Sequence, residues 1–532
     1  MKTIKLGKKN NIKTLSKRDF ELYSQKAPLI IDSIIKKNAS FIRKKEFCFP
    51  EFLNSVGKFY LAGDFLSAIK LATILEREYG CDLEFKDYVS LLSLISFLYT
   101  LSGCIKKGKE YIDKIAETKK IEDGLPYRFY MLSKIFYDYK NKDYLPVYLN
   151  AKRLISVFIE LDADDPIFVL QPKYHLIQKL IRMLNDSAIF LAENEKIGSE
   201  KKKLYFQTVS EALTRYKSLN SRTVDFFYYC ELSKMHSNFH NFGKAKKALD
   251  EAYEIIKGKK RAYEKYSFNF YESKAHYFSK KNDFSEAYKQ IKLAYRASFN
   301  VSDVNDEMCV IESFLKIAAD FSQSDPLLRK HASEFYMQGN SLLKQFINFL
   351  EEKDWYTGKN HSAKVASMSY LIAKKLLTIH PYMKNYIDVQ SVFLAGYVHD
   401  IGKVKIPWLL INKISKLEEF EVDYLMAHVI FGKEILEDLN FNAIAKIIFQ
   451  HHESPDGTGY PEGATNVSIE ANIISLADSF EAMTTSNRKY KKPKSLETAK
   501  QEIISLSGSK FYPEIIEAFK SIKTEELKSF LK

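Results

Sequence analysis

The distribution of apolar residues is helical over the first part of the chain. From about residue 50 to residue 320, apolar positions recur at the spacing of a helix face. Four segments share a polar or glycine step, an aromatic residue, two variable residues and a small or apolar one: GDFLSA (63–68), KDYLPV (142–147), HNFGKA (240–245) and NDFSEA (282–287). Residues 102–112 fit as a worn copy between the first two. A spacing of about 40 residues predicts helical hairpins stacked in an array.

This pattern resembles a tetratricopeptide-type array of helical hairpins. The alternative is an all-α domain whose aromatic residues simply form the core. In either case this half holds no cluster of candidate catalytic residues. Because concave faces of helical repeats bind peptides or other proteins, we expect residues 50–322 to be a regulatory domain with such a partner. Residues 1–49 would be an N-terminal extension.

The pattern changes near residues 321–330. Ser-Asp-Pro is a helix-start signal, with Asp325 as the cap and Pro326 in the first turn, and the helix is predicted to run toward Lys353. Histidine use changes as well, because six of the eleven histidines lie between residues 361 and 452. We therefore place a second helical domain at residues 323–532. The predicted fold class is all-α, a helical-hairpin repeat array followed by a helical bundle.

Composition and charge narrow the choice of compartment and partner. The 532 residues are 46% hydrophobic and 28% charged, which is ordinary globular composition for two or three domains. The net charge of +14 comes mostly from lysines spread along the chain, so we expect no nucleic-acid polymer as partner. Five cysteines without a CxxC pair favour a reducing compartment. With no signal-peptide core and no apolar stretch of about 20 residues, we expect a cytoplasmic protein without a membrane span.

The histidine-rich region contains five polar motifs: DWYTGKNHSAKVA (354–366), VHDIGKVKIP (398–407), MAHVIFGKEIL (426–436), HHESPDGTGYPEG (451–463) and SLADSFEAMTT (475–485). The His399-Asp400 pair offers one site both a nitrogen and a carboxylate if it ends a helix, and other helices must bring the remaining ligands. The residues available for this are His361, His428, His451, His452 and Asp478. Imidazoles and carboxylates without thiolates suit iron, manganese or zinc, in a set larger than one metal needs. Two adjacent metals are the usual apparatus for phosphate ester hydrolysis.

Each of these residues also has a structural explanation when it is taken alone. His428 is compatible with a satisfied core histidine, and Asp478 with a helix cap. The His399-Asp400 dipeptide is common, and Lys403 could be one more surface lysine. Their occurrence together, in a fixed order, is what favours a metal site.

In combination, HDIGKVKIP, HHESPDGTGYP and ADSFEAMTT resemble the HD-GYP family, a branch of the HD superfamily of metal-dependent phosphohydrolases. The resemblance covers the C-terminal domain and says nothing about the first 320 residues. It implies an HD-type helical bundle with two divalent transition metals, iron or manganese. It also implies a cyclic di-GMP phosphodiesterase, in which a metal-bridged hydroxide opens the cyclic dinucleotide to linear pGpG, GMP or both.

The resemblance assigns the ligands residue by residue. The metal ligands that it implies are His361, His399, Asp400, His428, His451, His452 and Asp478. Asp400 would be the carboxylate shared between the two metals. Lys403 would act in catalysis and substrate binding by neutralising a phosphate oxygen.

Further positions correspond to the family's substrate-binding residues. Gly459, Tyr460 and Pro461 would form a wall beside the cleft, where glycine lets backbone approach the substrate and tyrosine offers a flat face and a hydroxyl. Arg488 and Lys491 resemble the basic pair that grips the second phosphate and a guanine edge, although aligning them requires one inserted residue.

Other departures from the family fall outside the ligand set. GATNVSIE, after the GYP loop, lacks a glycine and a proline found in the family, and Trp408 stands where an acidic residue is common.

The sequence also bears on the number of metals. Family members with a third metal carry a glutamate four residues before the first ligand histidine, one helical turn away. Here that residue is Thr357, a poor ligand for a hard cation, so we expect two metals. Asp354 could orient a metal ligand by a hydrogen bond.

Two other functions stay open. One is a non-catalytic receptor that binds a cyclic dinucleotide and signals through the repeats. The other is a hydrolase of another cyclic dinucleotide. The intact His-Asp pair and paired histidines favour the enzyme over the receptor, whereas the sequence does not fix the base preference.

Overall fold

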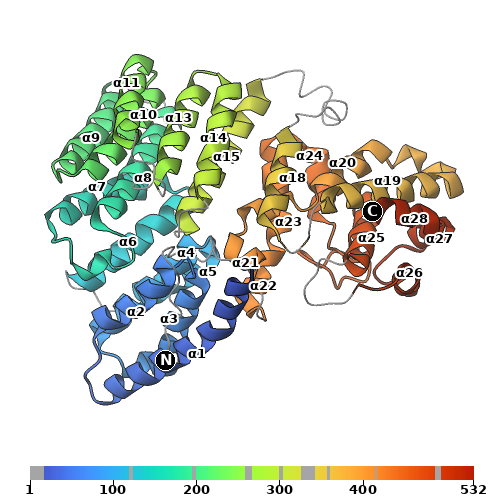
Figure 1. Cartoon of the computed structure of the whole chain (residues 1–532), viewed down its shortest axis with the longest axis horizontal. Helices are drawn as coiled ribbons and strands as arrows, with labels where there is room; N and C mark the ends of the chain where they lie inside the picture. Colours follow the sequence, from blue (N-terminus) through green and yellow to red (C-terminus); the bar gives the residue numbers. More distant parts are fainter. Residues whose placement is uncertain are drawn as a thin grey trace. The chain divides into compact units, whose positions relative to one another are not determined.

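The computed structural model describes residues 17–118, 121, 124–194, 199–257, 266–298, 304–324, 342–355, 357, 360–413, 416–485 and 493–531. Within these ranges the chain is helical and has no β-strand, and an isolated bridge pairs Ser507 with Phe511. The predicted all-α fold class is thus confirmed. The chain divides into two compact units, Met1–Ile317 and Ala318–Lys532 (Figure 1). The finer domain limits at residues 49 and 322 stay predictions.

Unit 1 consists of helices that pack on their neighbours in the chain as hairpins (Figure 1). Its helices are α1 (Lys17–Arg43), α2 (Phe49–Leu61), α3 (Phe65–Tyr79), η2 (Gly80–Asp82), α4 (Phe85–Leu101), α5 (Ile105–Ala116), α6 (Leu125–Lys140), α7 (Tyr144–Glu160), η3 (Pro166–Phe168), α8 (Lys173–Asn194), α9 (Ser199–Lys217), α10 (Arg222–Asn238), α11 (Phe242–Ile256), α13 (Ser267–Lys280), α14 (Phe284–Ser298) and α15 (Val304–Ser324). The hairpins are α2–α3, α4–α5, α6–α7, α8–α9, α10–α11 and α13–α14.

Within the described part of unit 1, five hairpin turns have one conformation. Each has a residue with positive φ after the first helix: Gly63, Gly103, Lys142, His240 and Asn282. The next residue donates its backbone N–H to a carbonyl five positions back, as Asp64 does to Phe59 (2.9 Å) and Asp283 to Phe278 (2.9 Å). The second helix begins one residue later. The four predicted repeat segments and the worn copy all lie at this turn, because each needs the same break between helices.

The residue three positions into each second helix packs where the helices cross. Ala68, Val147, Ala245 and Ala287 are fully buried. At Gly108, in the worn copy, an added Cβ would lie 2.4 Å from the Thr100 hydroxyl. Small residues recur here because the helices approach closely.

Unit 2 is organised around α19 (His361–Ile379), which packs against α20, α25 and α27. Its other helices are α18 (Leu342–Lys353), η5 (Pro381–Asn385), α20 (Val389–Val398), η6 (Ile401–Lys405), α21 (Trp408–Ile411), α22 (Glu419–Met426), α23 (His428–Asp438), α24 (Asn442–Phe449), α25 (Ile469–Thr484), α26 (Leu496–Ser505), α27 (Pro513–Ser521) and α28 (Thr524–Leu531). The helix predicted to run toward Lys353 is α18. Its predicted start at Asp325 and Pro326 lies outside the described residues.

Trp408, one of the departures from the family pattern, is a core residue. It is 1% exposed, and its ring meets the Trp355 ring edge to face with centroids 4.9 Å apart. The Asn412 side chain accepts a hydrogen bond from Trp355 N and donates one to Lys353 O, both at 2.9 Å. The tryptophan thus fixes the segment after α18 against α21.

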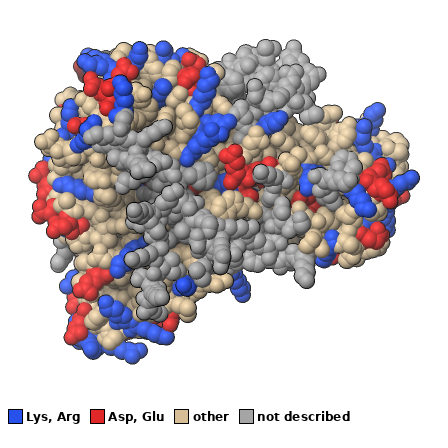
Figure 2. Space-filling model, viewed as in Figure 1, with Lys and Arg blue, Asp and Glu red and all other residues tan. Residues whose placement is uncertain are grey.

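The described surface carries interleaved charges. On the face in Figure 2, lysine and arginine side chains alternate with acidic ones within each unit. This distribution agrees with the observation that the lysines are spread along the chain rather than clustered. No helix among the described residues has the length and apolar character needed to cross a membrane.

Candidate metal centre

Helix ends bring the predicted ligands together. His361 is the first residue of α19, His399 follows the last residue of α20, and Asp400 precedes η6. His428 begins α23, and the His451-His452 pair follows α24. Only Asp478 lies inside a helix, α25. Side chains at helix ends can turn toward one point, which adjacent residues within a helix cannot do.

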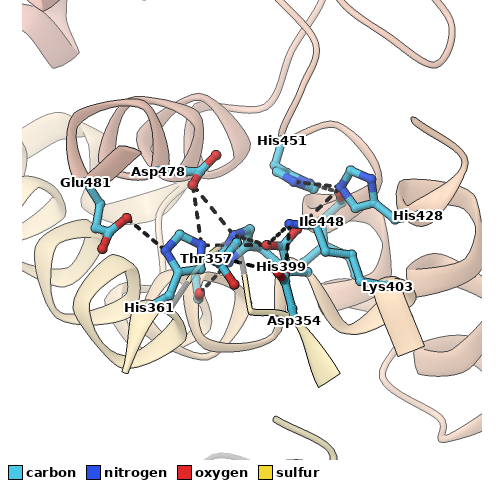
Figure 3. Close-up of polar contacts among 12 residues, drawn as sticks. Asp354, Thr357, His361, His399, Lys403, His428, Ile448, His451, Asp478 and Glu481 are labelled. Carbon is cyan, nitrogen blue, oxygen red and sulfur yellow. Dashed lines mark hydrogen bonds and ion pairs between the residues drawn. The ribbon is translucent and has the colours of Figure 1, made fainter. Parts of the chain in front are cut away.

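His361, His399, His428 and His451 point toward one another from different helices (Figure 3), and the Asp400 carboxylate lies close to three of these rings. Its Oδ2 atom lies 3.3 Å from His399 Nε2 and 3.6 Å from His361 Nε2. Its Oδ1 atom lies 3.5 Å from His428 Nε2. The two oxygens therefore face two different sets of imidazoles.

All seven predicted ligands belong to three overlapping groups, in each of which the candidate ligand atoms lie within 4.8 Å of one another. The groups are His361, His399 and Asp478; His428, His451 and His452; and His399, Asp400 and His451. Asp478 Oδ1 closes the first group, 3.5 Å from His361 Nε2 and 4.0 Å from His399 Nε2.

Backbone carbonyls set the orientation of three imidazoles. In each, Nδ1 lies within hydrogen-bond distance of the carbonyl three residues earlier: His399 with Gly396 O (2.8 Å), His428 with Leu425 O (2.7 Å) and His451 with Ile448 O (2.5 Å). A carbonyl can only accept, so Nδ1 carries the proton and the Nε2 lone pair faces the centre. His361 Nε2 and His399 Nε2 are buried without a hydrogen-bond partner among the described residues. These buried lone pairs fit ligands of a divalent metal.

The charge states of the cluster also fit a cation. Burial lowers the pKa of His428 to about 4 and the pKa of His451 to about 3, so both rings are neutral near pH 7. Burial raises the pKa of Asp400, but the Lys403 ammonium together with His399 and His361 holds the pKa well below its ordinary value. Burial lowers the pKa of His361, yet Asp400 and Glu481 raise it to about 10. The carboxylates that attract a proton to His361 would attract a metal cation in the same way.

Lys403 lies beside the central carboxylate. Its Nζ is 2.7 Å from Asp400 Oδ2 and 3.8 Å from Asp354 Oδ2. Burial disfavours the ammonium, but these two carboxylates raise its pKa above the ordinary value. Asp354 lies beside Lys403 and accepts a hydrogen bond from Thr357 N (3.1 Å).

Two glycines of the motifs allow backbone to approach at the centre. A Cβ at Gly402 would lie 1.9 Å from the carbonyl oxygen of His428. At Gly459 it would lie 2.4 Å from the Cα of Glu453 and 2.5 Å from the carbonyl oxygen of His452. The first contact seats η6 on α23, and the second folds the GYP loop onto the paired histidines.

The GYP loop covers one side of His452. Tyr460 stacks on the His452 ring with centroids 4.7 Å apart, and its backbone N–H donates to His452 O (3.1 Å). The buried carboxylate of Glu453 accepts from the backbone N–H groups of Glu462 (2.7 Å) and Ala464 (3.0 Å). The loop is therefore held at both ends, with its tyrosine fixed next to the ligand cluster.

Two residues that support the site were not identified from the sequence. Glu481 Oε2 lies 3.0 Å from His361 Nδ1, and Glu453 holds the GYP loop. Both signals were present, because Glu481 follows Asp478 by three residues on one helix face and Glu453 follows the paired histidines directly. Arg488 and Lys491 lie outside the described residues.

Removing the Glu481 carboxylate is expected to weaken metal binding about 10- to 100-fold, because it fixes the ring orientation and basicity of His361. Glu481→Gln should lose less than Glu481→Ala, since the amide oxygen can still accept from Nδ1–H. Glu470→Ala, in the first turn of the same helix, is the control. Competition with a metal chelator measures the affinities. Equal affinity in Glu481→Ala and the control would show that Glu481 does not support a ligand.

Comparison with known proteins agrees with this geometry. Residues 352–515 match the family model described as HD domain, which confirms the HD-type bundle predicted for the C-terminal part. A cyclic di-GMP phosphodiesterase of Thermotoga maritima is 35% identical over 208 residues, which are 37% of this chain and 54% of the relative. A probable cyclic di-GMP phosphodiesterase of Vibrio cholerae is 30% identical over 213 residues, 38% of this chain and 47% of the relative.

Another relative has a different printed specificity. A 3'3'-cGAMP-specific phosphodiesterase of Vibrio cholerae is 33% identical over 148 residues, 27% of this chain and 30% of the relative. The chain spans about half the length, or less, of these curated relatives. The HD domain and the histidine and aspartate groups together indicate a site for divalent metal.

Proposed function

We propose that this protein is a metal-dependent cyclic di-GMP phosphodiesterase that yields linear pGpG, GMP or both. The observation that carries the proposal is Asp400, whose two oxygens face two groups of buried imidazoles in an HD domain. Relatives named as cyclic di-GMP phosphodiesterases, at 30–35% identity, support the substrate.

The ligand arrangement supports two metals, which we propose to be iron or manganese. One would be held by His361, His399 and Asp478, and the other by His428, His451 and His452. Asp400 would be shared, one oxygen to each. When bound, such a pair supplies an activated water and neutralises charge on the attacked phosphate.

The chain's own residues position the dinucleotide in this proposal. Lys403, kept protonated by Asp400 and Asp354, would neutralise a phosphate oxygen as charge develops on it. Gly459, Tyr460 and Pro461 would wall the cleft, with the tyrosine ring presented from its stack on His452. Arg488 and Lys491 are proposed to hold the second phosphate.

The direct test uses metal-analysed protein and chromatography of the products from cyclic di-GMP. Formation of pGpG or GMP that stops when the metal is removed supports the proposal. Tight binding without products would identify the alternative, a non-catalytic receptor. Faster turnover of 3'3'-cGAMP than of cyclic di-GMP would identify the other alternative, a hydrolase of a different cyclic dinucleotide, which the cGAMP-specific relative makes worth testing.

Replacing Lys403 by alanine is expected to leave the metal bound and to slow turnover. The lost charge stabilisation should cost about 3 kcal/mol at most, or roughly 10²-fold in kcat/KM. Lys405→Ala, whose ammonium pairs instead with Glu434 (2.8 Å), is a matched control two residues away. Steady-state kinetics with elemental analysis separates the effects, and full activity in Lys403→Ala would remove Lys403 from the mechanism.

Unit 1 is proposed to be regulatory, with a protein or peptide partner, and the protein is proposed to act in the cytoplasm. The helical hairpins of unit 1 support this role because such arrays present extended binding faces.

A further inference from the structure

The turn between α26 and α27 is fixed to two elements that border the ligand cluster, the GYP loop and α25. Ser509 O in this turn accepts a hydrogen bond from Asp456 N, at the start of the GYP loop (3.2 Å). On the other side, the buried side chain of Asn472 in α25 donates to Lys510 O (2.9 Å) and accepts from Tyr512 N (3.0 Å). The backbone that carries the Lys510 side chain is therefore held in place by both elements.

The Lys510 ammonium has donors that the protein does not use. Its Nζ donates to Ser479 Oγ at 3.2 Å, and Ser479 directly follows the predicted ligand Asp478 in α25. The side chain is half-buried, and among the described residues no carboxylate forms an ion pair with it. An ammonium offers three N–H donors, so two are left for another acceptor. A cation held next to the metal centre by a neutral hydroxyl is suited to bind a ligand.

An acceptor lies near this cation on the GYP loop. The exposed Asp456 accepts hydrogen bonds from Thr458 N (3.0 Å) and Thr458 Oγ1 (2.7 Å), both at Oδ1. These hydrogen bonds lower the pKa of Asp456, and the Lys510 ammonium lowers it further, although the two side chains form no ion pair. Asp456 is therefore ionised near pH 7. Lys510 and Asp456 present donors and acceptors at neighbouring points without neutralising each other.

This arrangement matches the edge of a guanine base. Guanine carries the O6 acceptor next to its N1–H and N2–H₂ donors, whereas adenine carries the N6–H₂ donor next to the N1 acceptor. In the proposed mechanism the metals and Lys403 serve the attacked phosphate, and Arg488 and Lys491 serve the second one. The bases extend away from the phosphates, so residues that recognise a base edge lie beside the metal centre.

We propose that Lys510 and Asp456 recognise one guanine of the substrate. Lys510 donates to O6, and Asp456 accepts from N1–H and N2–H₂. Adenine at the same place meets a donor with its own N6–H₂ and a carboxylate with its N1 lone pair, so it is disfavoured. This inference rests on the proposed function for the identity of the substrate, and it assigns the base preference to two residues outside the ligand set.

Binding of GMP and AMP to the metal-loaded full chain tests the guanine site directly. Neither nucleotide has a phosphodiester bond, so calorimetry measures binding without turnover. GMP is expected to bind about tenfold more tightly than AMP. Lys510→Met should weaken GMP about tenfold and leave AMP unchanged. Asp456→Asn, which keeps an oxygen for Thr458 but loses the charge, should also weaken GMP selectively. Lys520→Met, an exposed lysine of α27, is the control and should change neither affinity.

Kinetics with cyclic di-GMP and cyclic di-AMP complete the test. Lys510→Met should lower kcat/KM for cyclic di-GMP about tenfold, with cyclic di-AMP turnover and metal content unchanged. Equal affinity of GMP and AMP in the unmodified chain would overturn the guanine site. An equal loss for both bases in Lys510→Met would overturn it too, because the lysine would then bind phosphate. A guanine preference that Lys510→Met removes, in a protein that hydrolyses no cyclic dinucleotide, would support the site and refute the proposed function.

Discussion

Replacing both His399 and Asp400 by alanine is expected to abolish hydrolysis of cyclic di-GMP. The change removes an imidazole whose Nε2 atom faces the centre and the carboxylate whose oxygens face both ligand groups. Metal ions supply several kcal/mol of charge stabilisation in phosphoryl chemistry, so the loss should be at least about 10³-fold. Product chromatography and elemental analysis of the same preparation measure the two consequences together.

A matched control is available in the same unit. His380 and Glu517 also form a histidine–carboxylate pair, with Nε2 and Oε2 3.1 Å apart, but Glu517 is exposed. Replacing both by alanine should leave activity and metal content unchanged. Full hydrolysis with intact metal in the His399→Ala/Asp400→Ala variant would disprove the proposed metal mechanism. Loss of activity in both double variants would point to unfolding instead.

The repeat architecture could be predicted from the sequence because the turn between the two helices of a hairpin depends on only a few consecutive residues. A positive φ at Gly63 or Asn282, followed by a helix that starts on an aromatic residue, needs only a few residues in order. The buried ion pairs of unit 1 could not be predicted from the sequence in the same way. Glu272 and Arg182 are far apart in sequence and look like ordinary surface residues until the array brings α8 and α13 together.

The ligand cluster could be predicted from the sequence because its residue types are rare and their order is specific. The structure brings together all seven residues that the sequence singled out. Their orientation was not predictable, because it depends on which carbonyl each Nδ1 atom reaches at a helix end. Trp408 is another example. Only the fold shows that this residue, which departs from the family pattern, packs edge to face against Trp355.

One step of the reasoning about metal number was wrong. Thr357 was placed one helical turn before His361, but α19 begins at His361 and Asn360 before it has a φ of 62°. Residue 357 therefore lies in the preceding turn, where its backbone N–H donates to Asp354. The chemical part of the reasoning still applies, because a hydroxyl brings neither the charge nor the second oxygen of a carboxylate.

Removing the metal is expected to eliminate activity. Adding two divalent ions per chain is expected to restore it. The five imidazoles and two carboxylates suffice for two ions once water completes each coordination sphere. A third ion would need a further carboxylate near His361, but Glu481 is already engaged with His361 Nδ1 at 3.0 Å, and Glu351 accepts hydrogen bonds from the backbone of Asn360 and Ser362. Titration of anaerobic apoprotein with iron or manganese should therefore give activity that saturates near two equivalents, with elemental analysis in agreement. Saturation near one equivalent would show that Asp400 does not serve two metals, and a reproducible value near three would show that Thr357 does not limit the site.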